Sequence, residues 1–264
     1  MRKFYFSVLE GLIFSCLIVS TNAFSSDSAW QSHLKSDYFG ASEIIEDESI
    51  MTIDSPVRAE NGAIVPIRLN AQIEQSDALY IKTVTLVIDN NPEPLAGIFH
   101  FTSFKGKADL ALRVRLNAYS NVRVIAETSD GKLHMSKRFV KASGGCSAPI
   151  GTNLEAAFKR MGKMKFKISP EADYNQSKQL QIAISHPNVT GMQMDQQTRM
   201  YAPAHYVRKV RITYNNVAIF WAETGISISE NPNFIFYFRP KQKGKLVAHV
   251  QDSKGLEFTK TLNL

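Results

Sequence analysis

Short segments rich in β-branched and aromatic residues, separated by turn-forming residues, recur along most of this chain. The first seven of these segments are residues 50–53, 63–69, 80–88, 97–102, 110–116, 121–127 and 133–140. The next seven are residues 164–168, 179–185, 206–214, 217–222, 234–238, 245–250 and 256–262. Seven short strands with a turn about every ten residues are typical of an immunoglobulin-like sandwich. We therefore predict an all-β chain that forms two such sandwiches.

The two sets of predicted strands also resemble each other. Residues 80–91 and 206–216 share a run that starts at a tyrosine and ends in two asparagines. Each set closes on a predicted hairpin, which turns at residues 129–131 in the first and at 252–255 in the second. These similarities favour two related sandwiches, predicted over residues 27–142 and 164–264.

Two short helices interrupt the strand pattern. Trp30, Leu34 and Tyr38 follow one another at helical spacing, which predicts a helix that packs on the first sandwich. A second helix is predicted in the connection at residues 143–163. There Thr152 and Glu155 form a capping box, and a glycine follows at the position of a C-terminal cap.

The first 23 residues have the pattern of a signal peptide. Arg2 and Lys3 precede an apolar run at residues 12–19, and small residues follow at the cleavage positions. The run is shorter than the about 20 residues that a membrane span needs. We therefore predict export to the periplasm, with residues 1–23 removed and no membrane span. The remaining basic residues are scattered along the chain, so a nucleic-acid interface is not expected.

A small-residue arm between the two predicted sandwiches contains the residue with the most obvious chemistry. Cys16 leaves with the signal peptide, so Cys146 is the one thiol expected in the mature protein and has no partner for an internal disulfide. Ser143, Gly144, Gly145 and Ser147 surround it, and two glycines give the backbone unusual freedom. This composition predicts a slim, mobile arm that presents a reactive thiol. The alternative is an ordinary linker with an incidental cysteine.

A second candidate site lies in the second half of the chain. His186, Met192, Met194 and His205 occur close together, with Cys146 as a further potential ligand, and such soft donors suit copper. The alternative is that these methionines fill gaps between packed elements, which flexible thioethers do well. No nucleophile–base motif, phosphate loop or dinucleotide fingerprint is present. We therefore expect neither an enzyme nor a resident cofactor.

Several of these stretches resemble known carrier proteins. Residues 143–146 resemble the Gly-Gly-Cys-Gly-Gly arm of SoxY, the periplasmic subunit that holds thiosulfate-oxidation intermediates on its cysteine. Residues 184–187, 203–205 and 225–232 resemble SoxZ, the partner of SoxY. A chain that contains both the SoxY-like and the SoxZ-like stretches resembles the fused SoxYZ-like carriers associated with quinoprotein dehydrogenases. The stretch 56–66 is also typical of that group.

The resemblance implies a SoxY-like and a SoxZ-like sandwich, with Cys146 as the covalent carrier of a sulfur species or a related adduct. It also implies periplasmic oxidising enzymes as partners, of the Sox type or of a quinoprotein dehydrogenase system. The chain departs from the SoxY pattern because the arm is internal and because Ser147 and Ala148 follow the cysteine in place of glycines.

Overall fold

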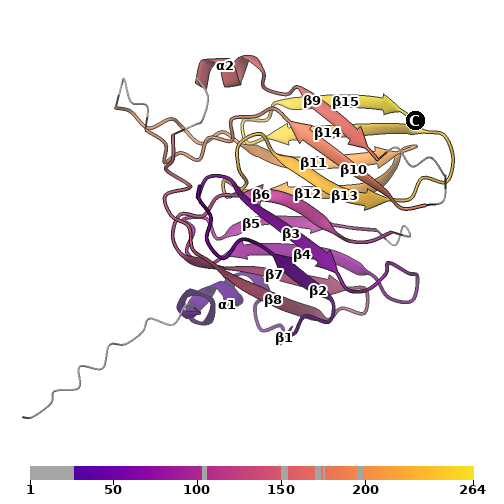
Figure 1. The fold of residues 1–264 in the computed structure, drawn as a ribbon, viewed down its shortest axis with the longest axis horizontal. Coiled ribbons are helices and arrows are strands. Elements are labelled where there is room, and N and C mark those ends of the chain that lie inside the picture. The colour runs from indigo at the N-terminus through magenta and orange to yellow at the C-terminus, as the bar shows by residue number, and fades with distance from the viewer. Residues whose placement is uncertain (1–26, 103–105, 150–153, 170–173, 175, 195–198) are drawn as a thin grey trace, which may run out of the picture.

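A computed structural model of the chain describes residues 27–102, 106–149, 154–169, 174, 176–194 and 199–264. The predicted signal peptide and the predicted cap at Thr152 lie outside these residues. Two β-sheets stack face to face, with one short helical segment at each end of the sandwich (Figure 1). The prediction of an all-β sandwich is confirmed.

The first half of the chain begins with a helical segment, η1 (Trp30–Leu34) and α1 (Lys35–Phe39). Eight strands follow: β1 (Ile44–Glu46), β2 (Met51–Asp54), β3 (Val65–Ala71), β4 (Ile81–Ile88), β5 (Leu95–His100), β6 (Leu110–Val114), β7 (Ser120–Thr128) and β8 (Leu133–Val140). The sequence predicts all of these strands except β1. That strand is short, largely exposed and rich in acidic residues, and it pairs in parallel with β8.

The second half begins with α2 (Leu154–Lys159) and contains seven strands. They are β9 (Met164–Ile168), β10 (Lys178–Ile184), β11 (Val207–Tyr214), β12 (Val217–Thr224), β13 (Asn233–Phe238), β14 (Lys245–Asp252) and β15 (Glu257–Asn263). Each lies within about two residues of a predicted strand. Burial alternates along several of these strands, as in β14, where every second residue is buried.

The order of strands in the two sheets shows that the two halves are related. One sheet has the order β1-β8-β7-β4-β5-β12-β11-β14-β15, and the other has the order β2-β3-β6-β13-β10-β9. Each strand from β2 to β8 therefore has an equivalent seven strands later in the chain. The two halves meet where β5 pairs with β12 and β6 pairs with β13, both antiparallel. The resemblance between residues 80–91 and 206–216 corresponds to the equivalent strands β4 and β11.

Apolar side chains from both halves fill one continuous core between the two sheets. At the joint, Phe99 and Phe220 lie in the large sheet and Phe234 and Phe236 in the small one. The rings of Phe220 and Phe236 stack with their centroids 4.5 Å apart. Because this cluster draws on both halves, burial of apolar area holds the two halves together as well as each half by itself.

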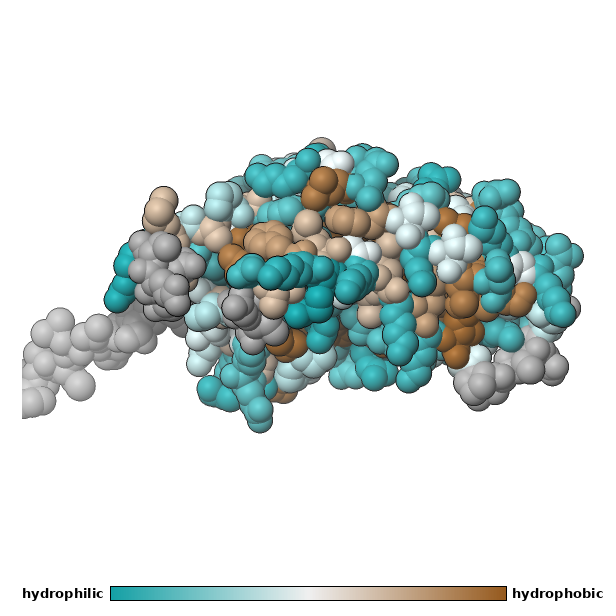
Figure 2. Space-filling model, turned by 90° about the horizontal axis from the view of Figure 1, so that it is seen from above, coloured by the Kyte–Doolittle hydropathy of each residue, from teal (hydrophilic) through white to brown (hydrophobic). Residues whose placement is uncertain are grey.

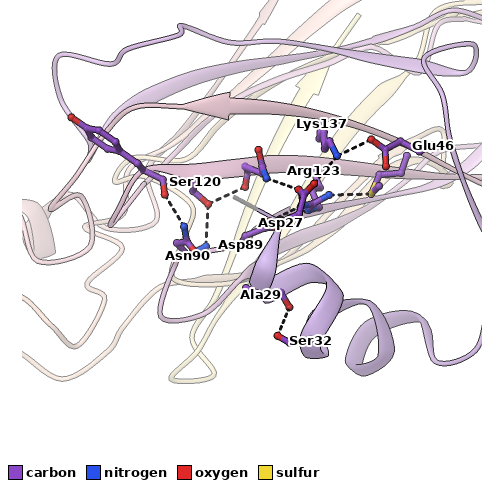
Figure 3. Close-up of polar contacts among 12 residues, drawn as sticks. Asp27, Ala29, Ser32, Glu46, Asp89, Asn90, Ser120, Arg123 and Lys137 are labelled. Carbon is purple, nitrogen blue, oxygen red and sulfur yellow. Dashed lines mark hydrogen bonds and ion pairs between the residues drawn. The ribbon is translucent and has the colours of Figure 1, made fainter. Parts of the chain in front are cut away.

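The N-terminal helix packs on the outer face of the large sheet through a buried arginine. Trp30 lies over the guanidinium of Arg123, whose Cζ is 4.7 Å from the ring centroid. Arg123 donates to Asp89 at 2.8–3.0 Å and also pairs with Asp27, which in turn contacts Lys137 (Figure 3). Charge pairing therefore compensates the burial of this arginine. The predicted contact of the helix with the first sandwich is confirmed.

The edge strand β15 closes the large sheet at the end of the second half. Seen from above that end, the surface is mostly hydrophilic, with hydrophobic residues scattered among the polar ones (Figure 2). Polar and charged side chains on an exposed edge oppose pairing with another sheet. Among the described residues, no helix has the length and apolar character that a membrane crossing requires.

Candidate carrier site around Cys146

The predicted arm leaves β8 and passes between the two halves of the chain. Ser143, Gly144 and Ser147 are exposed, as expected of an arm. Gly145 and Cys146 are instead buried, and the cysteine has no solvent exposure. The expectation of an exposed thiol on a freely mobile arm is therefore wrong for this conformation, because backbone and side-chain contacts from both halves hold the arm in place.

Backbone packing against the first half explains the two glycines. The amide of Gly144 donates to the carbonyl of Asn117 and that of Gly145 to the carbonyl of Leu116, both at 2.9 Å. A Cβ atom on Gly145 would lie 2.0 Å from the carbonyl oxygen of Gly62, which is too close for any side chain. Gly144 has a φ of 69°, in the left-handed region that favours glycine. The glycines thus let the arm seat closely against the sandwich.

A loop of the second half, between β10 and β11, holds the other side of the arm. The hydroxyl of Thr190 donates to the carbonyl oxygen of Cys146 at 2.6 Å. The side-chain amide of Gln193 donates to the carbonyl oxygen of Ala148 at 3.0 Å. Gln193 also accepts from the amide of Thr190, which orders the loop. The arm is therefore clamped by hydrogen bonds from both halves of the chain.

Arg115 lies directly behind the arm, just after β6. Its Nη1 donates to the carbonyl oxygen of Gly145 at 3.3 Å, and its Nη2 donates to that of Asn188 at 3.1 Å. Only 1% of Arg115 is exposed. The sequence could not identify it, because Leu110, Leu112, Val114 and Leu116 alternate inward and place position 115 on the opposite, usually solvated face. The arm and the 186–193 loop cover that face.

Burial controls the acidity of the thiol. It raises the pKa of Cys146 to about 11, while the neighbouring positive charge of Arg115 opposes the rise and Glu93 adds to it. The same burial lowers the pKa of the Arg115 guanidinium, against the attraction of Glu230 and Cys146. At neutral pH the seated cysteine is therefore a thiol and not the nucleophilic thiolate. Its reaction with a partner requires the arm to leave its seat, because the buried sulfur atom is both protonated and out of reach.

The predicted metal-binding residues are only partly brought together. His186 and His205 meet at the buried carboxylate of Asp252, which the sequence analysis did not identify. The Nε2 of His205 is 2.7 Å from Asp252 Oδ2, and the Nε2 of His186 is 3.6 Å from the same oxygen. These three donors lie within 4.8 Å of one another, and Cys146 does not join them among the described residues.

Hydrogen bonding at His186 favours a structural role for this cluster. The backbone amide of Asn188 donates to Nδ1 of His186 at 3.0 Å, so a neutral ring carries its proton on Nε2. That nitrogen then has no lone pair to offer a metal ion. Burial, with a further contribution from the neighbouring His205 ring, lowers the pKa of His186 to about 4. The ring is therefore neutral at pH 7 and orders the loop that clamps the arm.

Two family models match the chain, one in each half. Residues 35–146 match the sulfur oxidation protein SoxY, and residues 166–263 match the sulphur oxidation protein SoxZ. The first match ends at the buried cysteine. No curated protein is similar enough to match the chain.

Several solved structures are similar to parts of the chain. The sulfur carrier protein SoxY from Chlorobium limicola f thiosulfatophilum is 26% identical over 44% of this chain and 94% of its own, with a TM-score of 0.37. A superoxide reductase from Ignicoccus hospitalis is 16% identical over 35% of this chain and 79% of its own, with a TM-score of 0.31. The fibronectin(III)-like modules of Clostridium thermocellum CbhA are 14% identical over 81% of this chain and 92% of their own, with a TM-score of 0.24.

Proposed function

The chain is a fused SoxYZ-like protein, a carrier of sulfur oxidation, and on that premise we propose that Cys146 is the residue that carries the sulfur group. The observation that supports this most is the position of the thiol. Cys146 lies on a glycine arm at the end of the SoxY match, and residues of both halves hold that arm. Ser143, Gly144, Gly145 and Ser147 complete the carrier arm.

The burial of Cys146 suggests a carrier with two positions. In the seated position described above, the thiol or its adduct is shielded from water and from small thiols. In the released position, the arm presents the sulfur atom to a partner enzyme. Release breaks the hydrogen bonds that Thr190, Gln193 and Arg115 donate to the arm, while the strands of both sheets stay intact. Release also breaks the backbone hydrogen bonds from Gly144 and Gly145 to the first half.

We propose the following biological setting for the carrier. The signal pattern of residues 1–23 supports a periplasmic location, although these residues lie outside the described part of the chain. The cargo is a sulfur species or a related adduct. The partners are oxidising enzymes of the Sox type or of a quinoprotein dehydrogenase system, as the resemblance of the fused chain implies. In this proposal the chain carries its cargo without catalysing the oxidation. The SoxY-like domain is residues 27–142, and the SoxZ-like domain is residues 164–264.

Mass spectrometry of protein purified from its native compartment tests the carrier role. We expect a reducible sulfur adduct that maps to Cys146 and increases when the organism is supplied with oxidisable sulfur compounds. The Cys146→Ser variant, expressed in the same way, should lack this adduct. Native protein with an unmodified Cys146 under all such growth conditions would overturn the proposal.

The copper-binding alternative has one supporting observation, the convergence of His186 and His205 on Asp252. We expect these residues to be structural, because the hydrogen bond from Asn188 occupies the Nδ1 lone pair of His186. Titration of the purified protein with Cu(I) and Zn²⁺ distinguishes the two functions. Stoichiometric, tight binding that is lost on substitution of Met192 and Met194 by leucine would support the copper module.

A further inference from the structure

Two arginines in the described part of the chain are almost completely buried, and their surroundings differ. Arg123 is bound by the carboxylates of Asp89 and Asp27 (Figure 3). Arg115 is 1% exposed, and its hydrogen bonds go to backbone carbonyl oxygens only. Its Nε atom is buried and has no hydrogen-bond partner. Among the described residues, no carboxylate lies within ion-pair distance of the Arg115 guanidinium.

A buried cation without a counter-charge is costly, and proteins normally pair such a group or bind an anion beside it. Glu230 and Glu93 are the carboxylates whose charges reach this region, and both are partly exposed. Arg115 Nη1 donates to the carbonyl oxygen of Gly145, directly before Cys146, and the positive charge of Arg115 acts on the Cys146 thiol. The buried charge therefore lies beside the arm to which the proposed cargo is attached.

We propose that Arg115 binds the anionic end of the group carried on Cys146 and thereby selects negatively charged adducts over neutral ones. This inference rests on the proposed carrier role of Cys146. Planar guanidinium groups bind tetrahedral and planar oxyanions through paired N–H donors. The Nε donor is free, and the 3.3 Å bond from Nη1 to Gly145 is long for an N–H···O contact, so both donors can turn to an anion. The adducts favoured are those that end in a sulfonate or a negatively charged sulfur atom.

An equilibrium competition on the purified full-length chain tests this selection. The protein is incubated with equal amounts of 2-mercaptoethanesulfonate and 2-mercaptoethanol together with the disulfides of both. The Cys146 thiolate attacks a disulfide, one mixed disulfide forms, and one small thiolate leaves and takes up the proton released by the cysteine. Mass spectrometry of the Cys146 peptide then gives the ratio of anionic to neutral adduct. At equilibrium, this ratio does not depend on how fast the arm opens.

The comparison uses three substitutions. Arg115→Gln removes the charge, Arg115→Lys keeps the charge without the planar fork, and Arg68→Gln removes an exposed charge on β3 as the matched control. Relative to protein unfolded in urea, we expect the native chain to favour the sulfonate on the order of tenfold. Arg115→Gln should abolish this preference, Arg115→Lys should reduce it, and Arg68→Gln should leave it unchanged. An equal ratio in the native chain and in Arg115→Gln would overturn the proposal.

The wild-type chain alone provides a second test in case Arg115→Gln does not fold. A preference that comes from Arg115 should persist at 1 M salt, because a buried pair is screened much less than exposed charges. A preference that disappears at 1 M salt would come from the general positive charge of the surface and would overturn the proposal. These outcomes are separate from the carrier role. Sulfur adducts found on native Cys146 without any charge preference would leave the carrier in place and remove only the role of Arg115.

Discussion

The Nη1 atom of Arg115 lies 3.3 Å from the carbonyl oxygen of Gly145, directly before the cysteine, while its Nη2 binds the carbonyl oxygen of Asn188 in the second half. One side chain therefore connects the core of the first half, the arm and the loop of the second half. The seated position of the arm therefore depends on contacts from both halves of the fused chain.

The reactivity of Cys146 should depend on pH in an unusual way. Because burial raises its pKa to about 11, we expect the rate of iodoacetamide modification to keep rising from pH 7 to about pH 10. A free cysteine would level off above about pH 9. Rates measured by mass spectrometry over this range check the prediction. A plateau near pH 8.5 would mean that the thiol titrates as an exposed group.

Substitution of Gly145 by alanine should release the arm. The added Cβ would lie 2.0 Å from the backbone oxygen of Gly62, so the arm has to move away from its seat. We expect modification of Cys146 at pH 7 to become about tenfold faster or more, since burial no longer protects the thiol. Ser143→Ala, at an exposed arm position, is the matched control. Equal rates in the two variants would show that the packing of Gly145 does not limit access.

Replacement of Cys146 should have a measurable effect on stability. A thiol on an exposed, mobile arm, as the sequence predicts, would give a surface-type effect within about 0.5 kcal/mol for Cys146→Ser. Since the residue is fully buried, we now expect the hydroxyl to lower the free energy of unfolding by about 1–2 kcal/mol. Urea denaturation measures this difference. Cys146→Ala is the companion variant that introduces no polar group, and a larger loss for alanine than for serine would contradict the expectation.

Acid should weaken the clamp on the arm through His186. Burial lowers the pKa of His186 from 6.5 to about 4, so the unfolded chain takes up this proton before the folded chain does. Stability is therefore unaffected by this group above pH 6.5 and falls as the pH decreases from 6.5 to 4, by on the order of 2–3 kcal/mol. Denaturation curves across this window measure the fall. An NMR midpoint near 6.5 for the His186 ring would contradict the prediction.

The sequence alone determined the secondary structure and the family of this protein. Short segments rich in β-branched and aromatic residues, separated by turn-forming clusters, located every strand from β2 to β15, because the residues that a strand buries leave a mark in the local sequence. The missed strand, β1, is short and mostly exposed, so burial imposed little pattern on it. The carrier candidate Cys146 was also found from sequence, because a single cysteine in a glycine arm is a local feature.

Only the tertiary structure decided how the two halves join and what surrounds the thiol. The pairing of β5 with β12 and of β6 with β13 involves strands far apart in the chain. The burial of Cys146, the unpaired charge of Arg115 and the contact of His186 with Asp252 likewise depend on segments that fold over one another. Local sequence describes what a strand buries on its own faces. It does not describe what a distant loop covers, which is why Arg115 has the pattern of a solvated residue and yet lies in the interior.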